Sequence, residues 1–348
     1  MALIPSEILA EAHTACGYRS YYGDWLQNIG SIIVLHGHYR TVSAVLKSFS
    51  GRLTQPRWRF HDSVNPDLLT GLVIPGQGTA VVAASWLDDS GGCSPTQDIH
   101  HIRLEDTAER YPFPSPDVYR HLRIAKEYLL DIHDFWQHST KLPGAVHNVQ
   151  DILLNAFAAP QEGPLGPRQA RHGFGTSLSV RGPYSPVGMR PAQRRTLIIS
   201  PPGSGVAELM RTLGHHAAER GDGVIFLHCG LDPDQVDHLY LPDRQWLISH
   251  SVAPHWQQPT MDDQVFDLTA VSEDRDTGDS LNTLYYLYAQ AYHMAWAQIS
   301  RETPQAGVPN QGLVRHGLNQ LASALPQMGT PAEIARACNT GTAQERLF

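Results

Sequence analysis

Short runs of apolar residues alternate along the chain with segments in which apolar residues recur every three or four positions. The runs at 32–35 and 197–199 are typical of buried strands, and each is followed by a turn and a helix-spaced segment. Further short runs follow each helix and predict more strands, at 57–60, 79–84, 223–227 and 245–248. This alternation predicts an α/β fold with a largely parallel sheet in each half of the chain.

The two halves also share sequence. Residues 60–75 align with 227–242 without a gap, and five positions are identical: His61/His228, Pro66/Pro233, Asp67/Asp234, Leu72/Leu239 and Pro75/Pro242. An unrelated pairing of this length would give roughly one identity, so the pattern indicates an internal duplication.

Each half closes in helices that also align. Residues 117–138 and 281–299 match through four pairs of positions, Ile124/Leu284, Tyr128/Tyr288, His133/His293 and Trp136/Trp296, and a second helix follows near 146–158 and near 313–325. A Pro- and Gly-rich stretch at 159–168 separates the halves. We therefore predict two tandem α/β domains with helical caps, residues 1–160 and 161–348.

Composition narrows the classes of function. The net charge is −8 and the basic residues are dispersed, so we expect no nucleic-acid partner. No secretory signal or membrane-length apolar segment is evident, and four cysteines without CxxC spacing favour a reducing cytoplasm. The nineteen histidines show no HExxH spacing, so we predict no metal ligands.

The turn between the first strand and helix of each half is where a phosphate-binding loop of pattern G-x-x-x-x-G-K-[ST] would lie. The second half reads SPPGSGVA over 200–207, with Val206 and Ala207 in place of the Lys and the hydroxyl residue. The first half reads HGHYRTVS over 36–43, in which the turn is predicted at 36–41 and only Ser43 keeps a required type. Both motifs are degenerate.

The whole chain resembles a bacterial family of tandem P-loop proteins, described as ATPases or nucleotide kinases. The resemblance rests on HC-x-x-D-P-D at 228–234, on HD-x-W at 133–136, and on Arg171, His172, Gly182 and Pro183. It implies two P-loop NTPase-like domains with ATP as the ligand. The family's acidic magnesium anchor after the third strand is replaced by His250 and by Ala84.

These replacements remove the cation and the metal anchors that phosphoryl transfer needs. We therefore predict a catalytically impaired protein that binds nucleotide at most weakly, with a sensing or scaffolding role. The ligand would be ATP, with or without Mg²⁺, held by the free N–H groups of the helix. The predicted binding residues are Pro202, Gly203, Ser204, Gly205, Val206, Ala207, His228, Asp232 and Asp234, with Gly37, Arg40 and Ser43 in the first half.

Two other functions stay open at this point. An active ATPase or nucleotide kinase would need a rebuilt phosphate site, for which Arg40, Arg195, His228 and Asp234 are the candidates. A metal-dependent hydrolase would use histidines such as His250 and His255. No catalytic residue and no protein partner can be named from the sequence.

Overall fold

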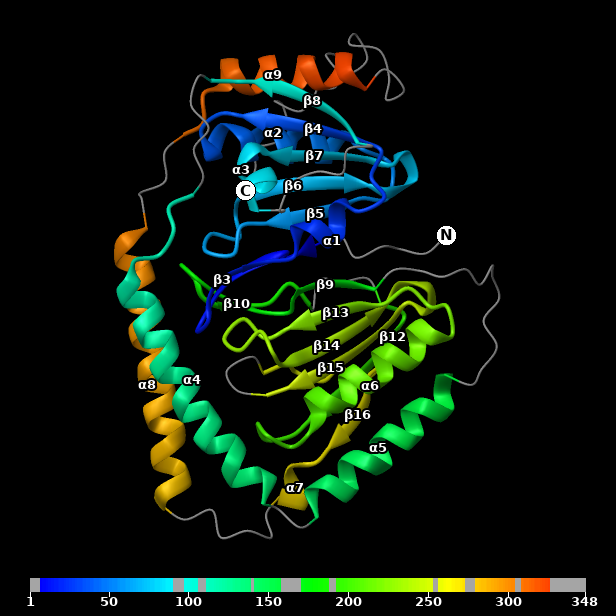
Figure 1. The fold of residues 1–348 in the computed structure, drawn as a ribbon, viewed down its shortest axis with the longest axis vertical. Coiled ribbons are helices and arrows are strands. Elements are labelled where there is room, and N and C mark those ends of the chain that lie inside the picture. Colours follow the sequence, from blue (N-terminus) through cyan, green and yellow to red (C-terminus); the bar gives the residue numbers. More distant parts are fainter. Residues whose placement is uncertain are drawn as a thin grey trace. The chain divides into compact units, whose positions relative to one another are not determined.

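The computed structural model describes residues 7–89, 97–105, 111–138, 141–157, 170–187, 192–252, 256–272, 279–303 and 308–325. The protein is α/β, with two mixed, mostly parallel sheets of six strands each and flanking helices, so the predicted class is confirmed (Figure 1). Two short hairpins add to the sheets: β2 (Glu11–Thr14) with β3 (Gly17–Ser20), and β10 (Ser177–Ser179) with β11 (Gly182–Tyr184).

The first sheet has the strand order β1-β5-β6-β7-β4-β8. Its strands are β1 (Glu7–Ile8), β4 (Ser31–His36), β5 (Trp58–His61), β6 (Leu69–Ile74), β7 (Thr79–Ala83) and β8 (Asp98–Arg103). Strand β4 pairs in parallel with β7 and β8, whereas β6 runs antiparallel to β7. Helix α2 (Tyr39–Arg52) crosses over from β4.

The second sheet repeats this order. Its strands are β9 (Arg171–Phe174), β12 (Arg194–Ile199), β13 (Ile225–His228), β14 (Val236–Leu241), β15 (Trp246–Ser251) and β16 (Gln264–Asp267), in the order β16-β12-β15-β14-β13-β9. Read from β9, the second sheet has the order β9-β13-β14-β15-β12-β16. Each of these strands occupies the place of the corresponding strand of the first sheet, β1-β5-β6-β7-β4-β8. Identical order in both sheets is what a duplicated sequence requires.

Two details of the prediction were wrong. The shared block between His and Pro contains a strand in each half, β6 and β14, which the sequence interpretation left out. Helix α2 begins at Tyr39, so the turn before it consists of Gly37 and His38 and does not extend over 36–41. The His38 side chain accepts a hydrogen bond from the Arg40 N–H, which fixes this earlier start.

The four long predicted helices are present: α4 (Pro116–Gln137), α5 (Leu142–Phe157), α8 (Asp279–Glu302) and α9 (Gln311–Ala324). Shorter helices complete the fold: α1 (Tyr22–Leu26), α3 (Ala84–Asp89) and α7 (Thr269–Ser272). In the described part of the chain, no helix is both long and apolar enough to cross a membrane.

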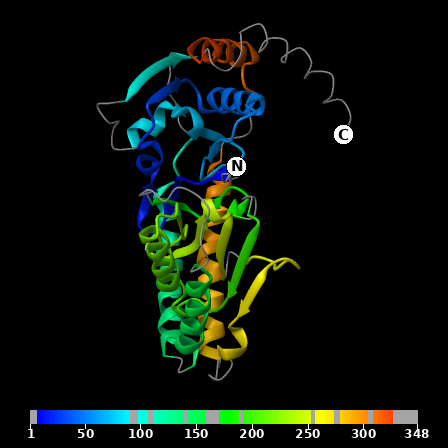
Figure 2. The same cartoon turned by 90° about the vertical axis from the view of Figure 1, so that its right-hand side faces the viewer.

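The closing helices are exchanged between the two sequence repeats. Helix α5 comes from the first repeat, yet it packs against α6 (Val206–Glu219) of the second; its apolar residues Val146, Val149, Leu153 and Phe157 join the cluster around Leu209 and Leu213. Conversely, α9 packs against α2 through Val314, Leu318 and Leu321. Figures 1 and 2 show both helix pairs lying side by side.

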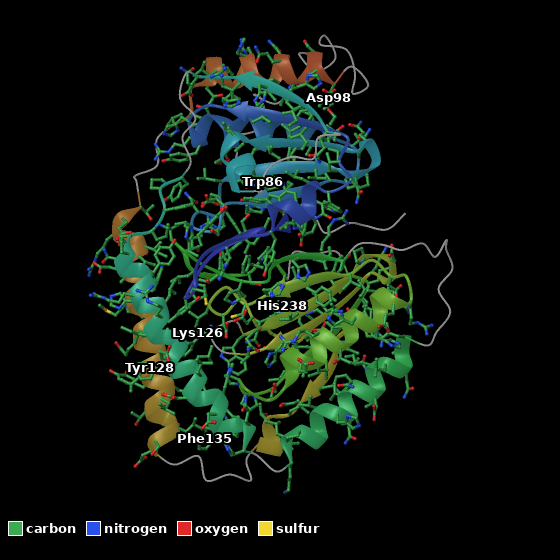
Figure 3. All side chains as sticks on the ribbon, in the orientation of Figure 1. Trp86, Asp98, Lys126, Tyr128, Phe135 and His238 are labelled. Carbon is green, nitrogen blue, oxygen red and sulfur yellow. The ribbon has the colours of Figure 1, made fainter. Side chains whose placement is uncertain are left out.

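The compact units therefore do not follow the repeats at 1–160 and 161–348. One unit contains Met1–Trp25, His61–Pro66 and Pro112–Pro304, and the other contains Leu26–Phe60, Asp67–Tyr111 and Gln305–Phe348. The first unit holds the second sheet with α4, α5, α6 and α8. In the other unit, Trp86 of α3 is buried and packs edge to face on Phe60 (Figure 3).

This helix exchange predicts a contrast between two adjacent residues of α5. Leu153 is fully buried in the cluster with α6, whereas Ile152 is 48% exposed. We expect Leu153→Ala to lower the free energy of unfolding by about 2–5 kcal/mol, because it removes buried methyl groups and leaves a cavity. Ile152→Ala, the matched control, should change it by less than about 0.5 kcal/mol. Denaturant unfolding followed by circular dichroism measures both, and equal effects would contradict the packing of α5 on α6.

Candidate functional site

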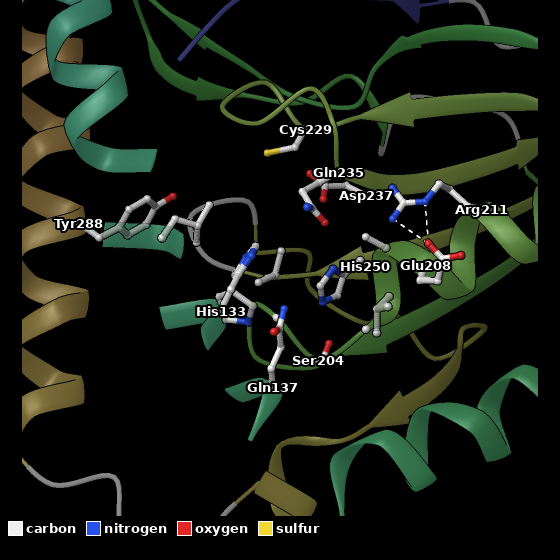
Figure 4. A pocket seen from close by; sticks show the side chains of 17 residues that line it. His133, Gln137, Ser204, Glu208, Arg211, Cys229, Gln235, Asp237, His250 and Tyr288 are labelled. Atoms are coloured by element: carbon white, nitrogen blue, oxygen red, sulfur yellow. Dashed lines mark hydrogen bonds and ion pairs between the residues drawn. The ribbon is translucent and has the colours of Figure 1, made fainter. Parts of the chain in front are cut away.

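A cavity of about 250 Å³ lies at the end of β12 in the first compact unit. Three groups of residues line it: the β12–α6 loop with the first turns of α6, residues at the ends of β13, β14 and β15, and two helices, α4 and α8. The lining residues are Leu129, His133, Gln137, Pro202, Gly203, Ser204, Gly205, Val206, Ala207, Glu208, Arg211, Cys229, Gln235, Asp237, His250, Val252 and Tyr288 (Figure 4). All six loop residues predicted from the second repeat are among them.

The loop between β12 and α6 has a backbone conformation that uses glycine at two positions. Gly203 and Gly205 both have positive φ, +78° and +91°, and Gly205 is the N-cap of α6. A Cβ on Gly203 would lie 2.5 Å from the Cα of His133, so α4 packs directly on the loop backbone. Only glycine satisfies both the left-handed backbone and this close approach. The loop is thus held between its own helix and α4.

A chain of hydrogen bonds fixes the loop from the sheet side. The Nε2 of His250, on β15, lies 2.8 Å from the Ser200 hydroxyl, which lies 2.7 Å from the Ser204 hydroxyl. All three side chains are buried. His250 therefore ties the loop to the sheet.

The two cavity histidines are uncharged at neutral pH. Burial lowers the pKa of His250 to about 4; a hydrogen bond with the Ser200 backbone opposes this shift, and nearby His133 adds to it. Burial also lowers the pKa of His133, against the smaller opposing effect of Asp232. Neither histidine therefore provides a positive charge to the cavity at neutral pH.

The other polar residues of the lining include buried groups whose pKa shifts favour the uncharged form. Burial raises the pKa of Asp237 to about 7, against the smaller opposing effect of a hydrogen bond from the Cys229 thiol. Burial likewise raises the pKa of the Cys229 thiol, which makes it a poor nucleophile. The hydroxyl of Tyr288 is buried and has no hydrogen-bond partner within the described residues.

Among the described residues that line the cavity, Arg211 is the only one with a positively charged side chain at neutral pH. Its guanidinium makes a 2.8 Å ion pair with Glu208 and donates a 2.8 Å hydrogen bond to the carbonyl of Asp234 (Figure 4). The Glu208 side chain is 70% exposed. An exposed pair of this kind is worth about 0–1 kcal/mol, so an anionic ligand can replace Glu208 on Arg211.

The other predicted residues of the second repeat lie outside the cavity lining. The Nδ1 of His228 donates to the carbonyl of Pro233 (2.7 Å), and its Nε2 lies 2.9 Å from the Nδ1 of His172. Asp232 is buried and forms a 2.9 Å ion pair with Lys126 of α4, which Figure 3 labels. Asp234 is exposed, and it is its backbone carbonyl that binds Arg211. These contacts hold the β13–β14 turn and α4 together.

The first repeat does not build an equivalent loop. Gly37 lies in the two-residue turn before α2, and Arg40 lies in the first turn of α2, where its guanidinium is 5.3 Å from the ring centre of Tyr39. The Ser43 hydroxyl is buried and accepts a 2.8 Å hydrogen bond from the Leu69 N–H. The Ser43 hydroxyl therefore links α2 to β6 by a hydrogen bond.

Of the described residues named for the two alternative functions, His250 lines the cavity and the others do not. Arg195 lies at the opposite end of β12 from the loop and bonds to Gln257, Gln258 and Asp263. His255 falls outside the described residues. Within the part of the chain that the structure describes, no three His, Cys, Asp or Glu side chains converge as a metal site would require.

Sequence reasoning missed the residues that α4, α8 and β14 contribute. His133 and Tyr288 stand in the helical blocks that align between the halves, and Cys229 lies in the HC-x-x-D-P-D element, so the repeat did mark them. Nothing in the sequence indicated that α4 of the first half lies over the loop of the second. Comparisons of the chain with protein-family models, curated proteins and solved structures found no match.

Burial of uncharged His250 predicts a dependence of stability on pH. Its pKa of about 4 lies below that of an unfolded histidine, so its contribution is present above about pH 6.5 and is lost as the pH falls toward 4, up to about 3 kcal/mol. Asp237 acts in the opposite direction, because its folded pKa is raised and its protonation stabilises the fold as the pH falls through about 7.

The difference between wild type and His250→Asn isolates the histidine, since Asn can accept a hydrogen bond from Ser200 but does not titrate. We expect wild type to lose more unfolding free energy than the variant between pH 6.5 and pH 4, measured by urea denaturation. His147→Asn, on the exposed face of α5, is the control. Parallel curves for wild type and His250→Asn would show that His250 does not titrate in this range.

Proposed function

We propose that the protein binds the phosphate part of a small ligand at the β12–α6 loop and does not catalyse phosphoryl transfer. The observation that carries the proposal is the joint placement, on one cavity, of the α6 N-terminus, Arg211 and the buried hydroxyl of Tyr288, which has no hydrogen-bond partner within the described residues. The helix N-terminus and Arg211 both favour an anion. A ligand would also provide the Tyr288 hydroxyl with a hydrogen-bond partner. The predicted P-loop NTPase-like ancestry is consistent with this placement and remains part of the proposal.

Binding is supported by the local electrostatics of the loop. The N-terminus of a helix carries the equivalent of roughly half a positive charge, and free N–H groups there bind anions. The 14-residue helix α6 begins at Val206 with Gly205 as its cap, and no side chain caps it within the described residues. Arg211, one and a half turns further along, adds a full charge on the same side of the helix.

Absence of turnover is supported by what occupies the catalytic positions. Val206, where the Lys would be, is buried in the apolar cluster with α5. Ala207 offers no hydroxyl, and uncharged His250 stands in place of the acidic magnesium anchor. Phosphoryl transfer depends on such cations and their anchors. The protein would hold a phosphate group as a sensor or scaffold does, without driving its transfer.

Isothermal titration of the full-length protein with ATP and with inorganic phosphate tests this proposal. We expect weak binding that Mg²⁺ does not strengthen, and no release of phosphate from ATP above the buffer rate. Tight Mg²⁺-dependent binding, or turnover that a substitution within residues 200–207 abolishes, would favour an active ATPase. Absence of any phosphate binding would refute the phosphate site itself.

Variants of the ion pair at the rim give opposite expected effects. Arg211→Gln should weaken phosphate binding by about tenfold or more, because it removes a charged hydrogen bond worth about 1.5–3 kcal/mol. Glu208→Gln should strengthen it, because Arg211 then has no competing carboxylate. The same titration measures both, with Arg220→Gln at the exposed far end of α6 as the matched control. Weakening by both Arg211→Gln and Glu208→Gln would point to a structural role of the pair.

A further inference from the structure

Tyr288 presents an unexplained polar group to the cavity. Its side chain is 4% exposed, and its hydroxyl has no hydrogen-bond partner within the described residues. The side chain extends from α8 toward the other lining residues (Figure 4). Buried hydroxyl groups are almost always hydrogen-bonded, because the loss of water must be compensated. A ligand group in the cavity would supply the missing partner.

The surroundings of Tyr288 are polar without being charged. Gln235 and Gln137 carry amides, His133 is a neutral imidazole, and Asp237 is partly protonated near neutral pH. Such groups both donate and accept hydrogen bonds, which matches the hydrogen-bonding capacity of ligand hydroxyls. Leu129 and Val252 add apolar wall on which C–H groups can pack. This end of the cavity suits a polyhydroxylated compound.

The size of the cavity limits what can be attached to a phosphate. Pockets for drug-sized ligands are usually about 300–1,000 Å³, and this cavity measures about 250 Å³. A phosphate with a single small ring or short chain fits this volume better than a nucleoside triphosphate does. The base and sugar of ATP would have to remain outside while the phosphates occupy the interior.

We infer that the ligand is a phosphorylated sugar or polyol whose phosphate binds at the α6 N-terminus and whose hydroxyls reach Tyr288. This inference rests on the proposed phosphate site and adds the chemistry of the rest of the ligand. The β12–α6 loop and Arg211 hold the charged end. Tyr288, Gln235 and Asp237 select for hydroxyls at the other end.

Titration calorimetry of the full-length protein with four probes tests the inference: inorganic phosphate, ribose 5-phosphate, ribose and ATP. We expect ribose 5-phosphate to bind at least tenfold more tightly than inorganic phosphate and more tightly than ATP. Tyr288→Phe should remove most of that advantage while leaving the affinity for inorganic phosphate unchanged. Tyr286→Phe, on the same helix but 63% exposed, is the matched control and should change neither.

A second measurement reports on the Tyr288 hydroxyl in the absence of ligand. Because the hydroxyl is buried and has no hydrogen-bond partner among the residues that the structure describes, its removal in Tyr288→Phe should leave the melting temperature unchanged or raise it. Ribose 5-phosphate that binds no better than inorganic phosphate, or an equal loss for both probes in Tyr288→Phe, would overturn the sugar-phosphate assignment alone. Failure of inorganic phosphate and ribose 5-phosphate to bind at all would overturn the proposed phosphate site with it.

Discussion

The need to bury the outer apolar face of α6 determines how the site is built. Leu209, Leu213 and their neighbours on α6 require a covering helix, and that helix is α5 of the first repeat. Because α4 directly precedes α5 in the chain, docking α5 on α6 places the end of α4 beside the β12–α6 loop. His133 reaches the cavity for this reason, and Gly203 must be glycine for the same reason. The packing of α5 on α6, which is 14 residues long, thus positions the walls of the cavity.

The two copies show which conserved contacts are structural. His61 and His228 each donate from Nδ1 to the carbonyl of the proline five residues later, over 2.6 and 2.7 Å. The other ring nitrogen differs in its partner, which is the carboxylate of Glu7 in one copy and His172 in the other. Burial and the neighbouring His172 lower the pKa of His228 to about 4. The shared histidine closes a turn, and its second contact is free to vary because it does not touch the cavity.

Much of the secondary structure could be predicted from local patterns in the sequence. Apolar runs and helix-spaced positions located β4, β12, α2, α6 and the four long helices, since strands and helices with one buried face leave a clear period. Strand β14 was not predicted because Asp237 and His238 interrupt its apolar pattern, although both side chains are buried. The start of α2 was misplaced because Tyr39 and Arg40 carry no apolar period, and a side-chain cap from His38 decides it. The loop residues 202–207, which line the cavity, could be located in the sequence because motif spacing is local.

The walls of the cavity could not be found in this way, because they depend on which core each cap helix covers. The apolar faces of α5 and α9 are similar, so composition alone does not decide which helix packs on α2 and which on α6. Once α4 and α8 close the cavity, its charge balance differs from that of a phosphate-transfer site. Among the described lining residues, positive charge comes from one rim arginine and a helix end, while burial favours the uncharged forms of His250 and Asp237 in an interior rich in hydrogen-bonding groups. A site of this kind stabilises a bound ground state through hydrogen bonds but offers little to a transition state that spreads negative charge over transferring oxygens. The proposed recognition without turnover would depend on the electrostatics of the enclosed residues more than on the loss of any single motif position.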